Sequence, residues 1–231
     1  MSKGNLRLFI NCVTAQYYPE TKNNIVLTMQ AIGFQQIFLE EQLCCGWVYN
    51  CTGNFNESLN AHQAIASQLS QAGLDLYFLE QRCFGAYQEP LIDNKQNEIK
   101  TTYVSAKLIN FNISKFFAFN NIKVNAVSSC FGVDFLKQIF LHTEGLSLHF
   151  QNFGFCCGAN NLDTALKLDY NDLIFSLIES AILNINGVKL FVFEDDFCRA
   201  RFAEAIKHKN FDFRVELMHW ADLIVTYGNS K

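Results

Sequence analysis

Cysteines stand out among the residues of this 231-residue chain that could do chemistry. Two adjacent pairs each precede a glycine, as Cys44-Cys45-Gly46 and Cys156-Cys157-Gly158. Adjacent cysteines rarely share a disulfide, because the bond would be strained. We therefore expect the two thiolates of each pair to lie side by side as ligands of one metal centre.

Single cysteines flank each pair, so that the pattern occurs twice. The first set is Cys12, Cys44, Cys45 and Cys83, and the second set is Cys130, Cys156, Cys157 and Cys198. Equivalent positions are offset by 118, 112 and 115 residues (130 − 12, 156 − 44 and 198 − 83). The gaps within a set are far longer than the C-x2-C pairs of zinc fingers and ferredoxins. Four soft thiolates delivered from separate strand ends favour an iron–sulfur cluster or zinc over hard cations.

The elements predicted around these cysteines alternate between strands and helices. The first half has predicted strands at 6–11, 36–40 and 74–79 and helices at 19–32 and 57–72. The second half has predicted strands at 123–128, 146–150, 189–193 and 213–217, with helices at 133–141, 170–185, after Cys198 to about Lys207, and 219–225. This alternation predicts an α/β fold of two repeated small halves, each a mostly parallel sheet covered by helices.

The predicted topology places the cysteines where α/β proteins form their sites. In each half, three cysteine positions follow directly behind predicted strands, and sites of such sheets lie at the carboxyl ends of the strands. We therefore expect a cysteine-lined metal site in each half or between the halves, with one domain over 1–110 and a second over 111–231. Gly46 and Gly158 have no Cβ, so they let the chain turn after two adjacent ligands.

Composition argues against several other classes of protein. The net charge is −4 and the pI is about 5.7, which leaves no basic footprint for a nucleic acid. No apolar run reaches the ~18 residues of a membrane span, and no signal peptide is recognisable. A cytoplasmic location is predicted, where thiols stay reduced, and the odd count of nine cysteines also argues against a disulfide framework. We find no nucleotide-binding motif of the G-x-G-x-x-G or P-loop type.

Several further residues have simpler interpretations. A buried packing role is common for a single cysteine, and we interpret Cys51, which lies outside the duplicated pattern, as a packing or incidental thiol. For His219 we expect a structural hydrogen bond. The acidic run 194–196 is expected in a solvated loop, and Arg199 and Arg201 are expected at the surface.

The duplicated motif resembles the cysteine-rich CCG-domain family, and the resemblance covers nearly the whole chain. Three segments are most similar to the lactate-utilisation branch of that family: C-x5-YPE at 12–20, GF…FLEEQLCCG at 33–46, and VELMHWADLI at 215–224. The heterodisulfide reductase branch ends each motif in C-x-x-C. Here Ala86 and Arg201 stand where that last cysteine would be.

The resemblance implies that both cysteine sets bind iron–sulfur clusters of the [4Fe-4S] type. It implies that the chain is an electron-transfer subunit of an L-lactate-oxidising complex. The partners of the chain would be other iron–sulfur subunits of that complex, and any contact with a membrane would come through those subunits. No residue pattern indicates where lactate itself reacts, so an enzymatic activity of this chain alone stays open. Two alternatives remain: a thiol/disulfide reductase subunit like that of heterodisulfide reductase, and a structural subunit with zinc in one or both halves.

Overall fold

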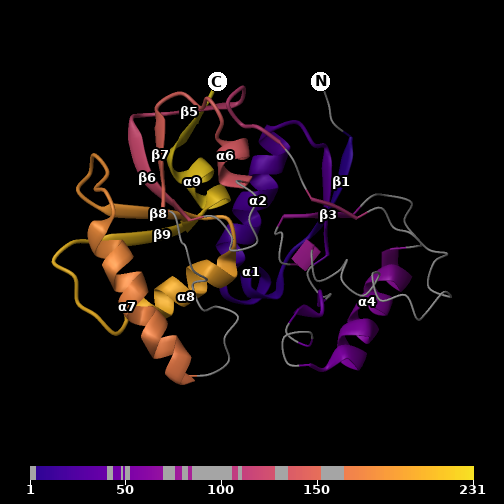
Figure 1. Cartoon of the computed structure of the whole chain (residues 1–231). Coiled ribbons are helices and arrows are strands. Elements are labelled where there is room, and N and C mark those ends of the chain that lie inside the picture. Colours follow the sequence, from indigo (N-terminus) through magenta and orange to yellow (C-terminus); the bar gives the residue numbers. More distant parts are fainter. Residues whose placement is uncertain are drawn as a thin grey trace. The chain divides into compact units, whose positions relative to one another are not determined.

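The fold is mixed α/β, as predicted, and it divides into two compact units. The computed structural model describes residues 4–40, 44–47, 49, 53–69, 76–79, 83–84, 106–108, 111–127, 135–151 and 164–231. The first unit comprises 1–22 and 29–109, and the second comprises 23–28 and 110–231. Within the described residues, each unit has one four-stranded sheet with helices that follow its strands (Figure 1), and residues 23–28 of the helix at 19–31 are counted with the second unit.

The sheet of the first unit is entirely parallel. It has the order β2-β1-β3-β4, with β1 (Asn5–Phe9) and β3 (Leu76–Phe78) in the middle and β2 (Gln36–Glu40) and β4 (Ala106–Leu108) at the edges. Four consecutive residues of β1 are buried, which fits a central strand covered on both faces.

Three helices are described after the strands of this first sheet. They are α1 (Cys12–Tyr17), α2 (Pro19–Ala31) and α4 (Phe55–Leu69). Pro19 occupies the first position of α2, where its missing N–H leaves no bond unmade. The helix ends at Ala31, and Gly33 follows with a φ of 107°, while the Phe34 N–H donates to the carbonyl of Met29 (3.1 Å). Proline at the start and glycine after the end therefore set the length of α2.

The sheet of the second unit is also entirely parallel, with the order β7-β6-β8-β9. Its strands are β6 (Ile122–Val127), β7 (Leu146–Phe150), β8 (Lys189–Phe193) and β9 (Val215–His219). The helices are α6 (Phe135–Ile139), α7 (Thr164–Ser180), α8 (Asp196–Ile206) and α9 (Trp220–Tyr227). A separate antiparallel ribbon pairs β5 (Phe117–Phe119) with β10 (Gly228–Ser230).

The two sheets have the same topology. In each of them the first strand in the chain is flanked by the second and the third, and the fourth pairs with the third. The predicted repeat of two small parallel-sheet halves is therefore confirmed at the level of strand order. Equivalent strands also carry equivalent cysteine positions behind them, because Cys12, Cys44 and Cys83 follow β1, β2 and β3 as Cys130, Cys156 and Cys198 follow β6, β7 and β8.

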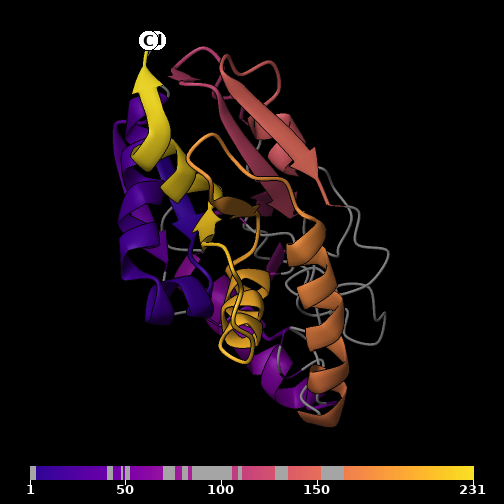
Figure 2. The same cartoon turned by 90° about the vertical axis from the view of Figure 1, so that its left-hand side faces the viewer.

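Two helices form one packed layer against β8 in the second unit. Helices α7 and α8 lie side by side (Figures 1 and 2). They enclose a core cluster with β8 whose buried members include Ile174 and Ile178 of α7, Phe191 and Phe193 of β8, and Phe202 of α8. The ring centroids of Phe193 and Phe202 are 5.0 Å apart in an edge-to-face arrangement. All five residues of β8 are buried, which identifies it as a central strand.

Helix α7 differs most from its predicted range, 170–185. It begins six residues earlier, at Thr164, and ends five residues earlier, at Ser180. The earlier end has a visible cause, since the Lys189 ammonium donates to the carbonyls of Ile178 (2.9 Å) and Glu179 in the last turn. Within the described part of the chain, no helix combines the length and apolar character needed to cross a membrane.

Candidate metal centre

Cys12 lies just beyond the carboxyl end of β1. It is the first residue of α1 and is exposed. The side chain of Asn11 caps this helix: its Oδ1 accepts a hydrogen bond from the Thr14 N–H (2.8 Å), and its Nδ2 donates to Thr14 Oγ1 (2.6 Å). Asn11 and Thr14 are both buried, so the backbone that carries Cys12 is firmly held.

The CCG motif follows β2 as a turn. Gly46 has a φ of 79°, a conformation that favours glycine, and its N–H donates to the Cys44 sulfur at 3.4 Å. The turn predicted at this glycine is therefore present. Burial raises the pKa of the Cys44 thiol above its usual value, the Gly46 N–H opposes this shift, and the neighbouring Cys45 adds to it. The thiol must lose its proton to become a metal ligand.

Cys45 and Cys83 belong to one buried cluster at the carboxyl ends of β1 and β3. Both are at most 4% exposed, and the cluster also contains Phe9 and Phe78, whose rings stack at 4.8 Å. Trp47 packs against it from outside. The structure thus brings together two predicted ligands from separate strand ends, in apolar surroundings that exclude water.

The structure describes five cysteines, Cys12, Cys44, Cys45, Cys83 and Cys198, and none of these five is in a disulfide. Among the residues that the structure describes, no group of three or more histidines, cysteines and acidic residues is close enough to hold a metal ion. The cysteines of the first set nevertheless fit a soft metal or an iron–sulfur cluster in chemistry, because they are unoxidised thiols that follow three strands of one sheet.

The second set is described only at Cys198. Cys51, Cys130, Cys156, Cys157 and Gly158 lie outside the described residues. Cys198 is the third residue of α8 and is buried in the cluster between α7, α8 and β8. It therefore stands behind β8, near the carboxyl edge of the second sheet.

The acidic run before Cys198 is buried, so the expectation of a solvated loop was wrong. Glu194, Asp195 and Asp196 are each at most 1% exposed. They directly follow the buried strand β8, and Asp195 caps α8 by accepting a hydrogen bond from the Phe197 N–H (2.7 Å). The helix cap at Asp195 could have been predicted from the sequence, since aspartate is a preferred capping residue and an amphipathic stretch follows it.

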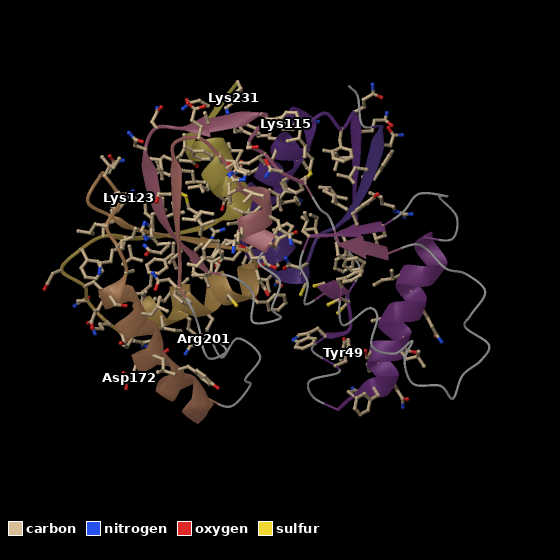
Figure 3. All side chains as sticks on the ribbon, turned by 45° about the horizontal axis from the view of Figure 1, so that its top comes forward. Tyr49, Lys115, Lys123, Asp172, Arg201 and Lys231 are labelled. Carbon is tan, nitrogen blue, oxygen red and sulfur yellow. The ribbon has the colours of Figure 1, made fainter. Side chains whose placement is uncertain are left out.

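The two arginines beside Cys198 are also inside the fold, contrary to expectation. Arg201 is 4% exposed and donates to Asn171 Oδ1 of α7 (2.6 Å). Figure 3 labels Arg201 on α8 and Asp172 on the neighbouring helix α7. Arg199 forms ion pairs with Asp196 (3.3 Å) and Asp222 (2.8 Å). Both arginines bind partners from other parts of the fold, which sequence spacing does not predict.

His219 has the structural hydrogen bond that was expected. It caps α9, with Nδ1 accepting from the Ala221 N–H (3.3 Å), while Asp222 Oδ2 accepts from the His219 backbone N–H (3.1 Å). Burial lowers the pKa of His219 below its usual value, and the carboxylates of Asp196 and Asp222 partly oppose the shift. A neutral imidazole is the form that can accept a hydrogen bond at Nδ1.

A comparison with protein families identifies the first half of the chain. Residues 6–87 match the family model of the cysteine-rich domain named CCG. Residues 6–87 are therefore similar to a CCG domain. The match covers Cys12, Cys44, Cys45 and Cys83 and indicates a metal-binding or iron–sulfur redox function. No curated protein matches the chain.

Several parts of the sequence interpretation stay predictions, and two of them concern the structure. One is the division into CCG domains over 1–110 and 111–231, because the family match lies in the first half. The other is the role of all eight cysteines as ligands.

Proposed function

We propose that this CCG-domain protein is an iron–sulfur electron-transfer subunit of an L-lactate-oxidising complex. Cys12, Cys44, Cys45 and Cys83 would hold one cluster, and Cys130, Cys156, Cys157 and Cys198 would hold a second. A bound cluster supplies one-electron transfer. The partners are other iron–sulfur subunits of the complex, and the chain works in the cytoplasm.

The observation that carries the proposal is the agreement between the family match and the first sheet. The matched residues, 6–87, include all four cysteines of the first set. These cysteines follow three parallel strands, and two of them already lie in one buried cluster. Parallel strands end at the same edge of a sheet, so ligands behind them can converge on one centre.

The residues of the first unit would each contribute in a different way. The thiolates bind, and Gly46 allows the chain to turn immediately after two adjacent ligands. The rings of Phe9 and Phe78 surround Cys45 and Cys83 with apolar surface, which limits the access of water and oxidants.

Support for lactate as the electron source comes from sequence similarity. The C-x5-YPE segment, which resembles the lactate-utilisation branch, spans α1 and the start of α2. A thiol/disulfide reductase is the weaker candidate, because Ala86 and Arg201 stand where that branch has a further cysteine. Arg201 is moreover tied to Asn171 inside the second unit.

The first test is metal content. Protein purified without oxygen should contain about four irons and four acid-labile sulfides per filled set of cysteines and show a broad brown absorbance. The Cys45→Ser variant should lose the first centre. Cys51→Ser is the matched control, since Cys51 lies in the same domain but outside the duplicated pattern, and it should keep its iron.

Two results would contradict the proposal. Stoichiometric zinc without sulfide would make the cysteine sets structural zinc sites. Unchanged iron in Cys45→Ser would remove this cysteine from the ligand set. The lactate assignment has its own test: L-lactate should bleach the cluster absorbance of the chain in complex with its native partners, and D-lactate is the control.

A further inference from the structure

Two helices of the second unit begin at the same edge of its sheet. Phe193, the last residue of β8, is paired in register with His219, the last residue of β9. Helix α8 begins at Asp196 and helix α9 begins at Trp220, so both start within three residues of these strand ends. Cys198 lies in the first turn of α8. Interactions that hold the first turn of α8 in place therefore also hold the Cys198 thiol in place.

One ion pair joins the first turns of these two helices. Arg199 Nη1 lies 2.8 Å from Asp222 Oδ2 and 3.3 Å from Asp196 Oδ1. The same Asp222 oxygen accepts the His219 N–H (3.1 Å), and Oδ1 accepts from Asn24 (2.9 Å), in the 23–28 segment that belongs to this unit. A single carboxylate therefore links α8, the end of β9 and the start of α9.

The ion pair of Arg199 and Asp222 is largely buried, so its removal should affect the structure around it. The side chains of Arg199 and Asp222 are 14% and 11% exposed. Exposed ion pairs contribute little, whereas removing one partner of a buried pair leaves the other charge without compensation. Arg199 also follows Cys198 directly in the chain, so a displacement of the Arg199 backbone would displace Cys198 as well.

We propose that Arg199 and Asp222 are positioning residues for Cys198, because their ion pair holds the first turn of α8 at the carboxyl edge of the second sheet. The inference rests on the proposed function, in which Cys198 is a ligand of the second centre. Residues that orient ligands without binding the metal change metal affinity by about 10–100-fold when they are removed.

The first readout is the reactivity of Cys198 in the full, reduced, metal-free chain. Cys198 is 3% exposed, so iodoacetamide reaches it only when the first turn of α8 opens locally. Alkylation, followed at Cys198 by mass spectrometry, should be about tenfold faster in Asp222→Asn and in Arg199→Gln than in the parent, which corresponds to a loss of about 1.4 kcal/mol in the free energy of local opening. The rate increase in the double variant should be smaller than the product of the two single increases, since both single variants remove the Arg199–Asp222 interaction.

Two further variants sharpen the comparison. Arg199→Lys keeps the positive charge and should stay nearer to the parent rate, and it also serves if Asp222→Asn does not fold. Arg214→Gln is the matched control. It breaks an ion pair with Glu216 in the same unit, but Arg214 is 73% exposed and precedes the amino end of β9. This control should react at the parent rate.

The second readout is retention of the metal by protein purified without oxygen. A chelator should remove the metal of the second centre about tenfold faster from Asp222→Asn than from Arg214→Gln. Alkylation and metal release at the control rate in Asp222→Asn and Arg199→Gln would overturn the inference. If the parent itself contains no metal, the proposed function fails, while the alkylation rates still decide whether the ion pair positions Cys198.

Discussion

Replacing Gly46 with alanine tests the CCG turn directly. Gly46 has a φ of 79°, and a residue with a Cβ is destabilised by about 1–2 kcal/mol in this region. Alanine also restricts the unfolded chain, which offsets the loss by about 0.4–1 kcal/mol. The net fall in the free energy of unfolding should therefore be about 1 kcal/mol, or roughly a fivefold change in the folding equilibrium.

A variant at Gly53 can distinguish the effect of backbone strain on stability from the effect of the CCG turn on metal binding. Gly53 has a φ of 74° and open space around the position of a Cβ, so Gly53→Ala carries the same backbone strain without touching a cysteine. Both variants should lose about 1 kcal/mol of stability. Only Gly46→Ala should lose metal from the first centre, because the Gly46 N–H donates to the Cys44 sulfur and the turn orients both cysteines.

Fluorescence can report the unit concerned, because the chain has only two tryptophans, Trp47 and Trp220. Trp47 packs on the cluster that contains Cys45 and Cys83. In a Trp220→Phe background, urea unfolding followed by fluorescence thus reports the first unit. A Gly46→Ala variant as stable as this background would show that the turn tolerates a Cβ. Equal loss of metal from Gly53→Ala would show that general destabilisation, not the turn, controls binding.

Three other predictions concern stability and its pH dependence. Gly145→Ala should destabilise the second unit by more than about 2 kcal/mol, measured by urea unfolding, because φ is 71° and the new Cβ would lie 1.7 Å from the Phe119 carbonyl oxygen. The free energy of unfolding should fall as the pH drops below about 6.5, by at most about 1.4 kcal/mol per pH unit. The reason is that burial lowers the pKa of His219 in the folded chain, so the unfolded chain binds the proton first. His219→Asn should remove this dependence, which urea titrations at several pH values can measure. Asn11→Ala should cost about 1 kcal/mol through loss of the cap on α1, and unchanged amide exchange at Thr14 would contradict it.

Strands were easier to predict than the ends of helices. The ranges 36–40, 146–150 and 189–193 match β2, β7 and β8 residue for residue. Each is a short apolar or alternating run with clear ends, and that pattern is local. The helix at α1 was missed, because its six residues have no apolar stripe and depend on the cap supplied by Asn11.

Features that depend on distant partners could not be predicted from the sequence. The acidic run 194–196 looks like a surface loop in isolation. Its burial follows from its place behind a central strand and from the ion pairs that Arg199 forms with Asp196 and with Asp222. The ribbon of β5 and β10 is another example, since three-residue strands have no recognisable signal until they pair.

The ribbon of β5 and β10 also constrains the order of events during synthesis. Phe119 pairs with Gly228, and 109 residues (228 − 119) separate them. At the usual ribosomal rate, β5 waits on the order of 5–20 s before its partner exists. During that interval its backbone presents an open strand edge to neighbouring chains. Conditions that slow translation or crowd nascent chains should therefore favour misassembly at this segment before any cofactor is involved.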